Sequence, residues 1–75
     1  MSRPQKRSVT IRGHRTSFSL EPPFYAELER LSEERGLPLA ALIAEIDAAR
    51  APDTNLSSAL RLFVLEQVKR EGARP

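Results

Sequence analysis

The chain has 75 residues, a net charge of +2, no cysteine and one histidine. This length allows one small domain, and so short a monomer buries too little apolar surface to be comfortably stable alone. Because neither a disulfide nor a thiolate-bound metal can add stability, association with a second copy is the expected route. No apolar run approaches the roughly 20 residues of a membrane helix, so we expect a cytoplasmic protein without a membrane partner.

The charge is unevenly distributed. Residues 1–20 contain five basic side chains and no acidic one, whereas residues 21–36 contain five acidic and two basic ones. This asymmetry suits a protein whose N-terminal end approaches a polyanion. We predict a flexible basic arm over residues 1–7, one domain over residues 8–71 and a tail over residues 72–75.

Apolar and polar residues alternate twice near the N-terminus, at Val9 and Ile11 and again at Phe18 and Leu20. This alternation is typical of half-buried strands. The alternation changes phase between the two pairs, so either a turn or a bulge at Gly13 must lie between them.

We predict strands over about residues 8–12 and 15–20, joined by a two-residue loop at 13–14, with a bulge in one long strand as the alternative. The hairpin would place Arg12 opposite Arg15, and like charges facing each other are easier to tolerate where an anion binds. One face would then be apolar, and the other would carry Ser8, Thr10, Arg12, Arg15, Ser17 and Ser19.

Three segments show the spacing of amphipathic helices, over about residues 22–35, 38–50 and 55–71. The first two begin at prolines, which suit the first helical position because their missing N–H would be unpaired there. Asn55 is a favourable cap for the third helix, and Gly36 a favourable end for the first.

The order of strand, helix, glycine-containing turn and helix resembles the ribbon-helix-helix superfamily of small repressors. The segments SVTIRGHRTSFSL and NLSSALR resemble a subgroup of its short bacterial members, and the resemblance covers about residues 8–68. It implies an α+β fold that is mostly α: an N-terminal hairpin or ribbon, two core helices and an extra C-terminal helix, in an intertwined homodimer. The matching residues are Thr16 to Phe24, Leu28, Leu31, Gly36 and Leu39 to Ile46.

In this family one strand from each subunit pairs into a ribbon, and the polar face of the ribbon enters the DNA major groove. The resemblance therefore implies a bacterial, dimeric DNA-binding protein that regulates transcription, as a repressor or an autoregulator. The positions that resemble base-reading residues are Arg15, Ser17 and Ser19, of which Arg15 is the strongest because a guanidinium can donate two hydrogen bonds to guanine.

The family also holds a DNA phosphate at the N-terminus of its second helix, where free N–H groups and the helix dipole favour an anion. The hydroxyl or amide side chains often found there are absent here, and Pro38 removes one donor. Backbone amides, together with basic side chains of the arm and of the first strand, would take their place. The expected phosphate contacts are Arg3, Lys6, Arg7, Arg12, Leu39 and Ala40.

The resemblance also implies a core shared by two chains. If the hairpin forms, however, the dimer sheet has four strands that span about 14 Å between outer axes, which is too wide for a major groove of about 12 Å. The first strand then detaches, or the sheet binds DNA differently, or the protein binds another protein. The expected dimer-core residues are Phe18, Leu20, Phe24, Leu28, Leu42, Ile43 and Ile46.

The sequence contains no nucleophile–base pair, no cluster of metal ligands and no glycine-rich phosphate loop. We therefore predict a protein that is not an enzyme and that needs no cofactor or metal. The alternative to DNA binding is a protein-interaction module, such as an antitoxin-like or adaptor dimer, whose third helix or tails engage a partner protein.

Overall fold

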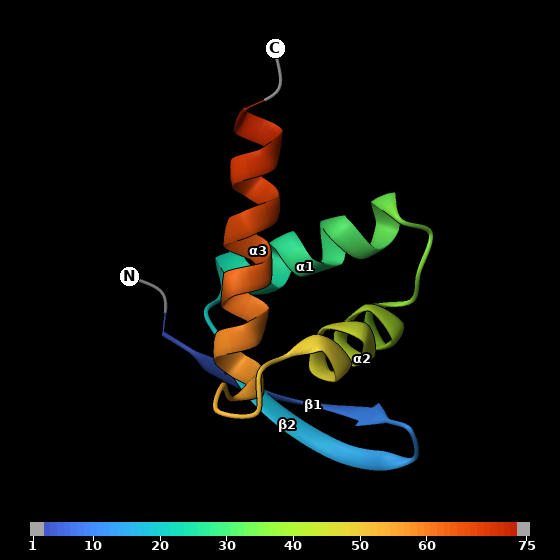
Figure 1. Cartoon of the computed structure of the whole chain (residues 1–75). Coiled ribbons are helices and arrows are strands. Elements are labelled where there is room, and N and C mark those ends of the chain that lie inside the picture. Colours follow the sequence, from blue (N-terminus) through green and yellow to red (C-terminus); the bar gives the residue numbers. More distant parts are fainter. Residues whose placement is uncertain (1–2, 74–75) are drawn as a thin grey trace.

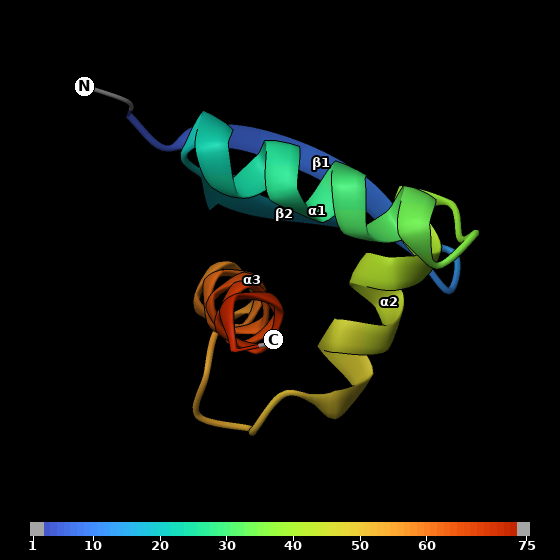
Figure 2. The ribbon, with the colours of Figure 1, turned by 90° about the horizontal axis from the view of Figure 1, so that it is seen from above.

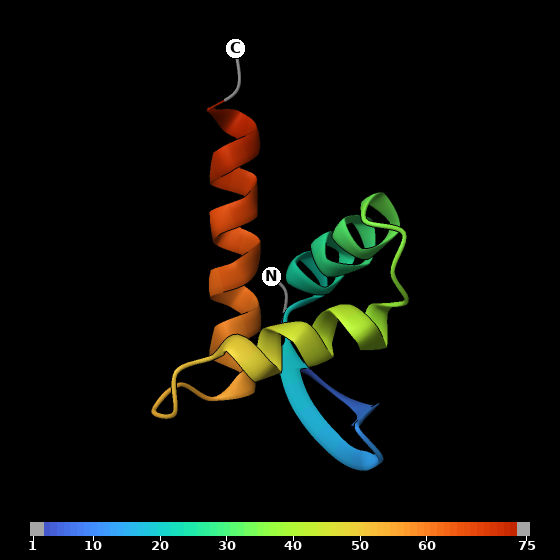
Figure 3. The same cartoon turned by 45° about the vertical axis from the view of Figure 1, so that its right-hand side comes forward.

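A computed structural model describes residues 3–73 and contains one two-stranded antiparallel sheet and three helices (Figure 1). The helices lie on one side of the sheet, and its other face is bare (Figures 1 and 3). The predicted α+β fold, with two core helices and an extra C-terminal helix, is confirmed. The elements are β1 (Gln5–Ile11), β2 (His14–Leu20), α1 (Pro22–Glu34), α2 (Leu39–Ala49) and α3 (Leu56–Gly72).

The two strands form a hairpin closed by a two-residue turn at Arg12 and Gly13, so the bulge alternative is wrong. Both turn residues have positive φ, 50° for Arg12 and 80° for Gly13, as a type I′ turn requires. The predicted loop at 13–14 is therefore displaced by one residue. A type II′ turn with glycine first was expected, whereas the chain places glycine second and forces an arginine into the left-handed region.

The displaced turn shifts the pairing by two residues, so Arg15 faces Thr10 and not Arg12. Because side chains alternate between faces with a period of two, a shift of two leaves every strand residue on its predicted face. The apolar and polar faces of the hairpin were therefore predicted correctly although the register was not.

β1 begins at Gln5, three residues before the predicted strand, and pairs with the whole of β2. The guanidinium of Arg7 lies 3.7 Å from the centre of the Tyr25 ring on α1, a cation–π contact that holds this end of the strand. The prediction of a flexible arm is therefore wrong for residues 5–7, and its first two residues lie outside the described part of the chain.

The helices begin and end close to the predicted residues. The side chain of Asn55 caps α3 by accepting a hydrogen bond of 2.8 Å from the Ser58 amide. Gly36, with a φ of 68°, follows the end of α1, as glycine does where a helix terminates in the left-handed conformation. Over residues 3–73, none of the helices has the length and apolar character of a membrane span.

The core lies between the inner face of the sheet and the three helices, and α3 packs against both α1 and α2 (Figure 2). Six of the seven predicted dimer-core residues are buried within a single chain, and the seventh, Phe24, is partly buried beside them. Within the single chain, α3 covers apolar side chains that the resemblance would place against a second subunit. Its buried side chains are Leu56, Ala59, Leu60 and Val64.

Candidate nucleic-acid interface

The sheet exposes a row of polar side chains on the face that points away from the helices. On the inner face Ile11, Phe18 and Leu20 are at most 5% exposed, so the alternate residues point outward. All three predicted base-reading residues lie together on this face, where Arg15 and Ser17 are exposed and Ser19 is half-buried. We call this surface the hairpin outer face; its residues are Lys6, Ser8, Thr10, Arg15, Ser17 and Ser19.

Sequence reasoning assigned Lys6 to a flexible arm, whereas the structure places it in β1 directly opposite Ser19. Ser8 faces Ser17, and Thr10 faces Arg15. The β1 row of the outer face therefore begins at Lys6 and not at Ser8, and it ends at Thr10 because Arg12 lies in the turn. The signal that could have revealed the longer strand is the length of β2, because an antiparallel hairpin pairs most of both strands.

The hairpin is cationic and is not neutralised from within. Residues 3–20 contain five basic side chains and no acidic one, and none of these five forms an ion pair with another described residue. The acidic side chains of α1, by contrast, are partly neutralised by Arg30, which bonds Glu27 at 2.7 Å and Glu34 at 2.6 Å. Among the described residues, most of the basic side chains that form no ion pair thus lie in residues 3–20.

Four of the predicted phosphate contacts lie around one hollow at the edge of β1, with a volume of about 490 Å³. Lys6 and Arg7 come from β1, and Leu39 and Ala40 form the N-terminus of α2. The amides of Ala41 and Leu42 bond to the Pro38 carbonyl, so the two preceding amides are the ones left without helix partners. The Arg7 Nε atom is buried and has no hydrogen-bond partner.

The other two predicted phosphate contacts lie elsewhere on the hairpin. Arg3 precedes β1 and Arg12 occupies the turn, and both are exposed. The hairpin therefore carries basic side chains at the start of β1 and at its tip, with the hollow near the first of these.

The end of β2 is anchored to α3. The Ser19 amide donates to the Ser57 Oγ atom at 2.9 Å, and the Arg61 guanidinium donates to the Ser19 carbonyl at 3.2 Å and to the Glu21 carboxylate at 3.0 Å. The backbone amide of Glu21 itself, and then the hydrogen bond from Arg61, lower the pKa of the Glu21 carboxyl. Sequence reasoning missed Ser57 and Arg61, because their contacts span about 40 positions and leave no local pattern.

Among residues 3–73 there is no group of three or more histidine, cysteine, aspartate or glutamate side chains that could hold a metal ion. The chemistry available on the outer face is that of hydroxyls, a guanidinium and an ammonium group, all of which form hydrogen bonds or ion pairs with an anionic ligand.

A comparison with protein-family models matches residues 4–68 to the ribbon-helix-helix domain. Neither the curated proteins nor the solved structures that were searched gave a match. The matched segment runs from the residue before β1 through most of α3 and covers well over half of the sequence. The chain therefore belongs to the ribbon-helix-helix domain family.

Proposed function

We propose that this chain is a bacterial, cytoplasmic transcription repressor that binds duplex DNA as a homodimer, with the hairpin outer face in the major groove. Members of its family generally bind DNA as dimers, acting as transcription regulators or antitoxins, and are typically not enzymes. The observation that carries the proposal is the outer face itself, which is exposed, polar and positively charged and has no acidic residue.

The width of the sheet favours insertion of the hairpin of a single chain. Neighbouring strands lie about 4.8 Å apart, so two strands fit a major groove of about 12 Å, whereas four strands spanning about 14 Å between outer axes do not. In the proposed complex β1 takes the place that a second subunit's strand has in the family's usual ribbon. The sheet that enters the groove then has two strands and not four, so it is no longer too wide for the groove.

Within the groove, Arg15 donates two hydrogen bonds to the O6 and N7 atoms of a guanine. Ser17 and Ser19 have shorter side chains. Their hydroxyls discriminate less between bases, because a hydroxyl both donates and accepts hydrogen bonds. The backbone of Ser19 is held by α3, so its side chain reaches the base edges at a fixed position.

A phosphate beside the groove binds in the hollow between β1 and α2. There Lys6 and Arg7 supply charge, and the amides of Leu39 and Ala40 supply donors at a helix N-terminus. Arg3 and Arg12 contact phosphates near the two ends of β1. These phosphate contacts position the hairpin on the duplex, but they do not distinguish one base sequence from another.

A second candidate function, an antitoxin-like or adaptor module, is favoured by the exposed leucines and valine of α3. Such residues mark protein contact sites when they are gathered on one face. This function predicts co-purification with a partner protein and no duplex binding at low salt.

The test is fluorescence anisotropy on a duplex selected from a random-sequence library. Arg15→Ala is expected to weaken binding about 5- to 150-fold, which is the range of one bidentate base contact. Arg70→Ala, which removes the same charge from the exposed end of α3, is the matched control and is expected to bind almost like the parent. Equal affinity of the parent and Arg15→Ala would contradict the assignment of Arg15, and no binding by the parent at low salt would contradict DNA binding.

A further inference from the structure

The third helix holds the last part of β2 by the backbone of one residue. The Ser19 amide donates to the Ser57 Oγ atom at 2.9 Å, and the Ser19 carbonyl accepts from the Arg61 guanidinium at 3.2 Å. Ser57 and Arg61 lie four residues apart and therefore on the same side of α3. Two side chains of one helix thus fix both polar backbone groups of a strand residue. We call Ser57 and Arg61 the α3 anchor.

The Arg61 side chain is itself held in place from the other side. Its Nε atom donates to the Glu21 carboxylate at 3.0 Å, and Glu21 lies in the link between β2 and α1. The guanidinium is a rigid planar fork. Its bonds to Glu21 and to the Ser19 carbonyl therefore fix both the position and the plane of the group that holds β2.

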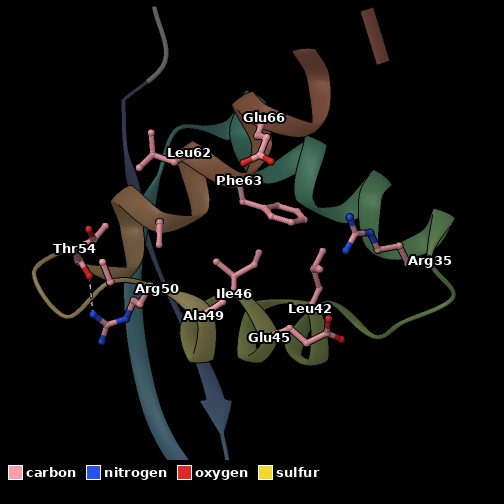
Figure 4. A pocket seen from close by; sticks show the side chains of 12 residues that line it. Arg35, Leu42, Glu45, Ile46, Ala49, Arg50, Thr54, Leu62, Phe63 and Glu66 are labelled. Carbon is pink, nitrogen blue, oxygen red and sulfur yellow. Dashed lines mark hydrogen bonds between the residues drawn. The ribbon is translucent and has the colours of Figure 1, made fainter. Parts of the chain in front are cut away.

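The start of α3 is a firm support for the anchor. Asn55 caps the first turn of the helix, and Leu60 of the next turn is completely buried in the core. In the loop that precedes α3, the Thr54 carbonyl accepts a hydrogen bond of 2.6 Å from Arg50, drawn as a dashed line in Figure 4. The same view shows Phe63 of α3 reaching toward α2. The helix that carries the anchor is thus held by its cap, its preceding loop and the core.

Apolar packing and the anchor constrain the hairpin in different ways. The buried side chains of Ile11, Phe18 and Leu20 hold its inner face against the helices. Apolar burial is non-directional, whereas a hydrogen bond weakens steeply when its angle departs from the preferred range. The α3 anchor therefore supplies a direction for β2, the strand that carries Arg15.

A small change of direction at the anchor is amplified along the strand. Arg15 lies four residues from Ser19, about 13 Å along β2, so a rotation of about 10° at Ser19 would move Arg15 by about 2 Å. A binding contact of defined geometry tolerates displacements of only about 0.5 Å. We propose that Ser57 and Arg61 are positioning residues that set the base preference of Arg15 through β2, an inference that rests on the proposed function.

The test compares the affinities for two duplexes at one salt concentration. One is the selected duplex, and the other has the same base composition in scrambled order. Their affinity ratio measures sequence preference, because phosphate contacts do not distinguish sequences. Ser57→Ala leaves the charge of the chain unchanged. It is expected to lower the ratio by at least about 5-fold, the lower end of what one bidentate base contact provides, with little change in affinity for the scrambled duplex.

Three further variants separate the anchor from its surroundings. Ser58→Ala, the same substitution at the next residue, is the matched control and is expected to keep the parent's ratio, because the Asn55 cap bonds the Ser58 amide and not its hydroxyl. Ser57→Thr retains a hydroxyl and is expected to recover most of the ratio. Arg61→Lys keeps the charge but loses the planar fork and is expected to lower the ratio as Ser57→Ala does.

Amide hydrogen exchange of the free chain, followed by NMR, tests the anchor without DNA. Ser57→Ala is expected to speed exchange of the Ser19 amide, which loses its acceptor, and to leave the amides of α1 as protected as in the parent. Unchanged exchange at Ser19 would overturn the inference.

The remaining outcomes distinguish this inference from the proposed function. A folded Ser57→Ala chain with the parent's affinity ratio would overturn the inference and leave the proposed function in place. An equal loss of affinity for both duplexes in Ser57→Ala and Arg61→Lys would do the same, since this is what a destabilised fold produces. A parent that binds neither duplex would contradict the proposed function, and the inference with it.

Discussion

At the scale of the residue, Arg12 is the least favourable choice in the hairpin. Its φ of 50° lies in the left-handed region, which costs a residue with a Cβ atom about 1–2 kcal/mol, and asparagine is much preferred in this turn. What arginine adds is a positive charge at the tip of a hairpin without acidic residues. A strained position that carries such a charge is the kind expected at a binding site.

Because of this strain, replacing Arg12 is expected to have opposite effects on the stability of the chain and on its affinity for DNA. Arg12→Asn is expected to stabilise the chain by up to about 1 kcal/mol in urea denaturation, because asparagine tolerates positive φ. The same change is expected to weaken duplex binding and to reduce the slope of log affinity against log salt by about one unit, the loss of one phosphate contact. A variant that gains stability and binds DNA as tightly as the parent would show that Arg12 does not contact DNA.

Glu21 predicts a dependence of stability on pH. Its pKa is held below the ordinary value of 4.5 by its backbone amide and then by Arg61. A carboxyl group whose pKa is lowered by folding stabilises the fold above its unfolded pKa and loses this effect as the pH falls through its folded pKa. The melting temperature of the parent is therefore expected to exceed that of Glu21→Gln near neutral pH, and the difference to shrink below about pH 4.5. A difference that stays constant on acidification would contradict this linkage.

At the scale of the element, the sequence predicted what is encoded locally. The Asn55 side chain caps the amide of Ser58, Gly36 adopts a positive φ just after α1, and the prolines lie at helix starts. These are all local effects, so the predicted helix boundaries were close to the observed ones. The hairpin register was not, because it depends on an arginine with positive φ that no propensity favours. The contacts of Ser57 and Arg61 with β2 could not be predicted either, because they arise only after α3 has packed.

α3 is an integral part of the core, and its contribution to the free energy of unfolding can be measured. Leu60 is completely buried in a single chain, so Leu60→Ala is expected to cost about 2–5 kcal/mol in urea denaturation, as a deep core truncation does. Glu29→Ala, at an exposed position of α1, should change stability by less than about 0.5 kcal/mol. A similarly small effect of Leu60→Ala would mean that α3 is only an appendage.

At the scale of the whole molecule, the polar hairpin and the protruding part of α3 are separated in space. The hairpin lies on one side, and the protruding part of α3 on the other (Figures 1 and 3). The family resemblance correctly implied the elements and the outward-facing residues. The core was expected to require two chains, yet it closes within one because α3 covers the residues assigned to a partner. A short sequence does not reveal this closure, since the apolar stripe of α3 suits either a partner or its own chain.

The proposed function requires that the hairpin outer face is the surface that contacts DNA. The decisive measurement is a titration of the ¹⁵N-labelled chain with the selected duplex, followed by two-dimensional NMR. The amides of β1, β2 and the first residues of α2 are expected to shift, with little change in the C-terminal half of α3. Shifts confined to α3, with the hairpin signals unchanged, would contradict the proposed function.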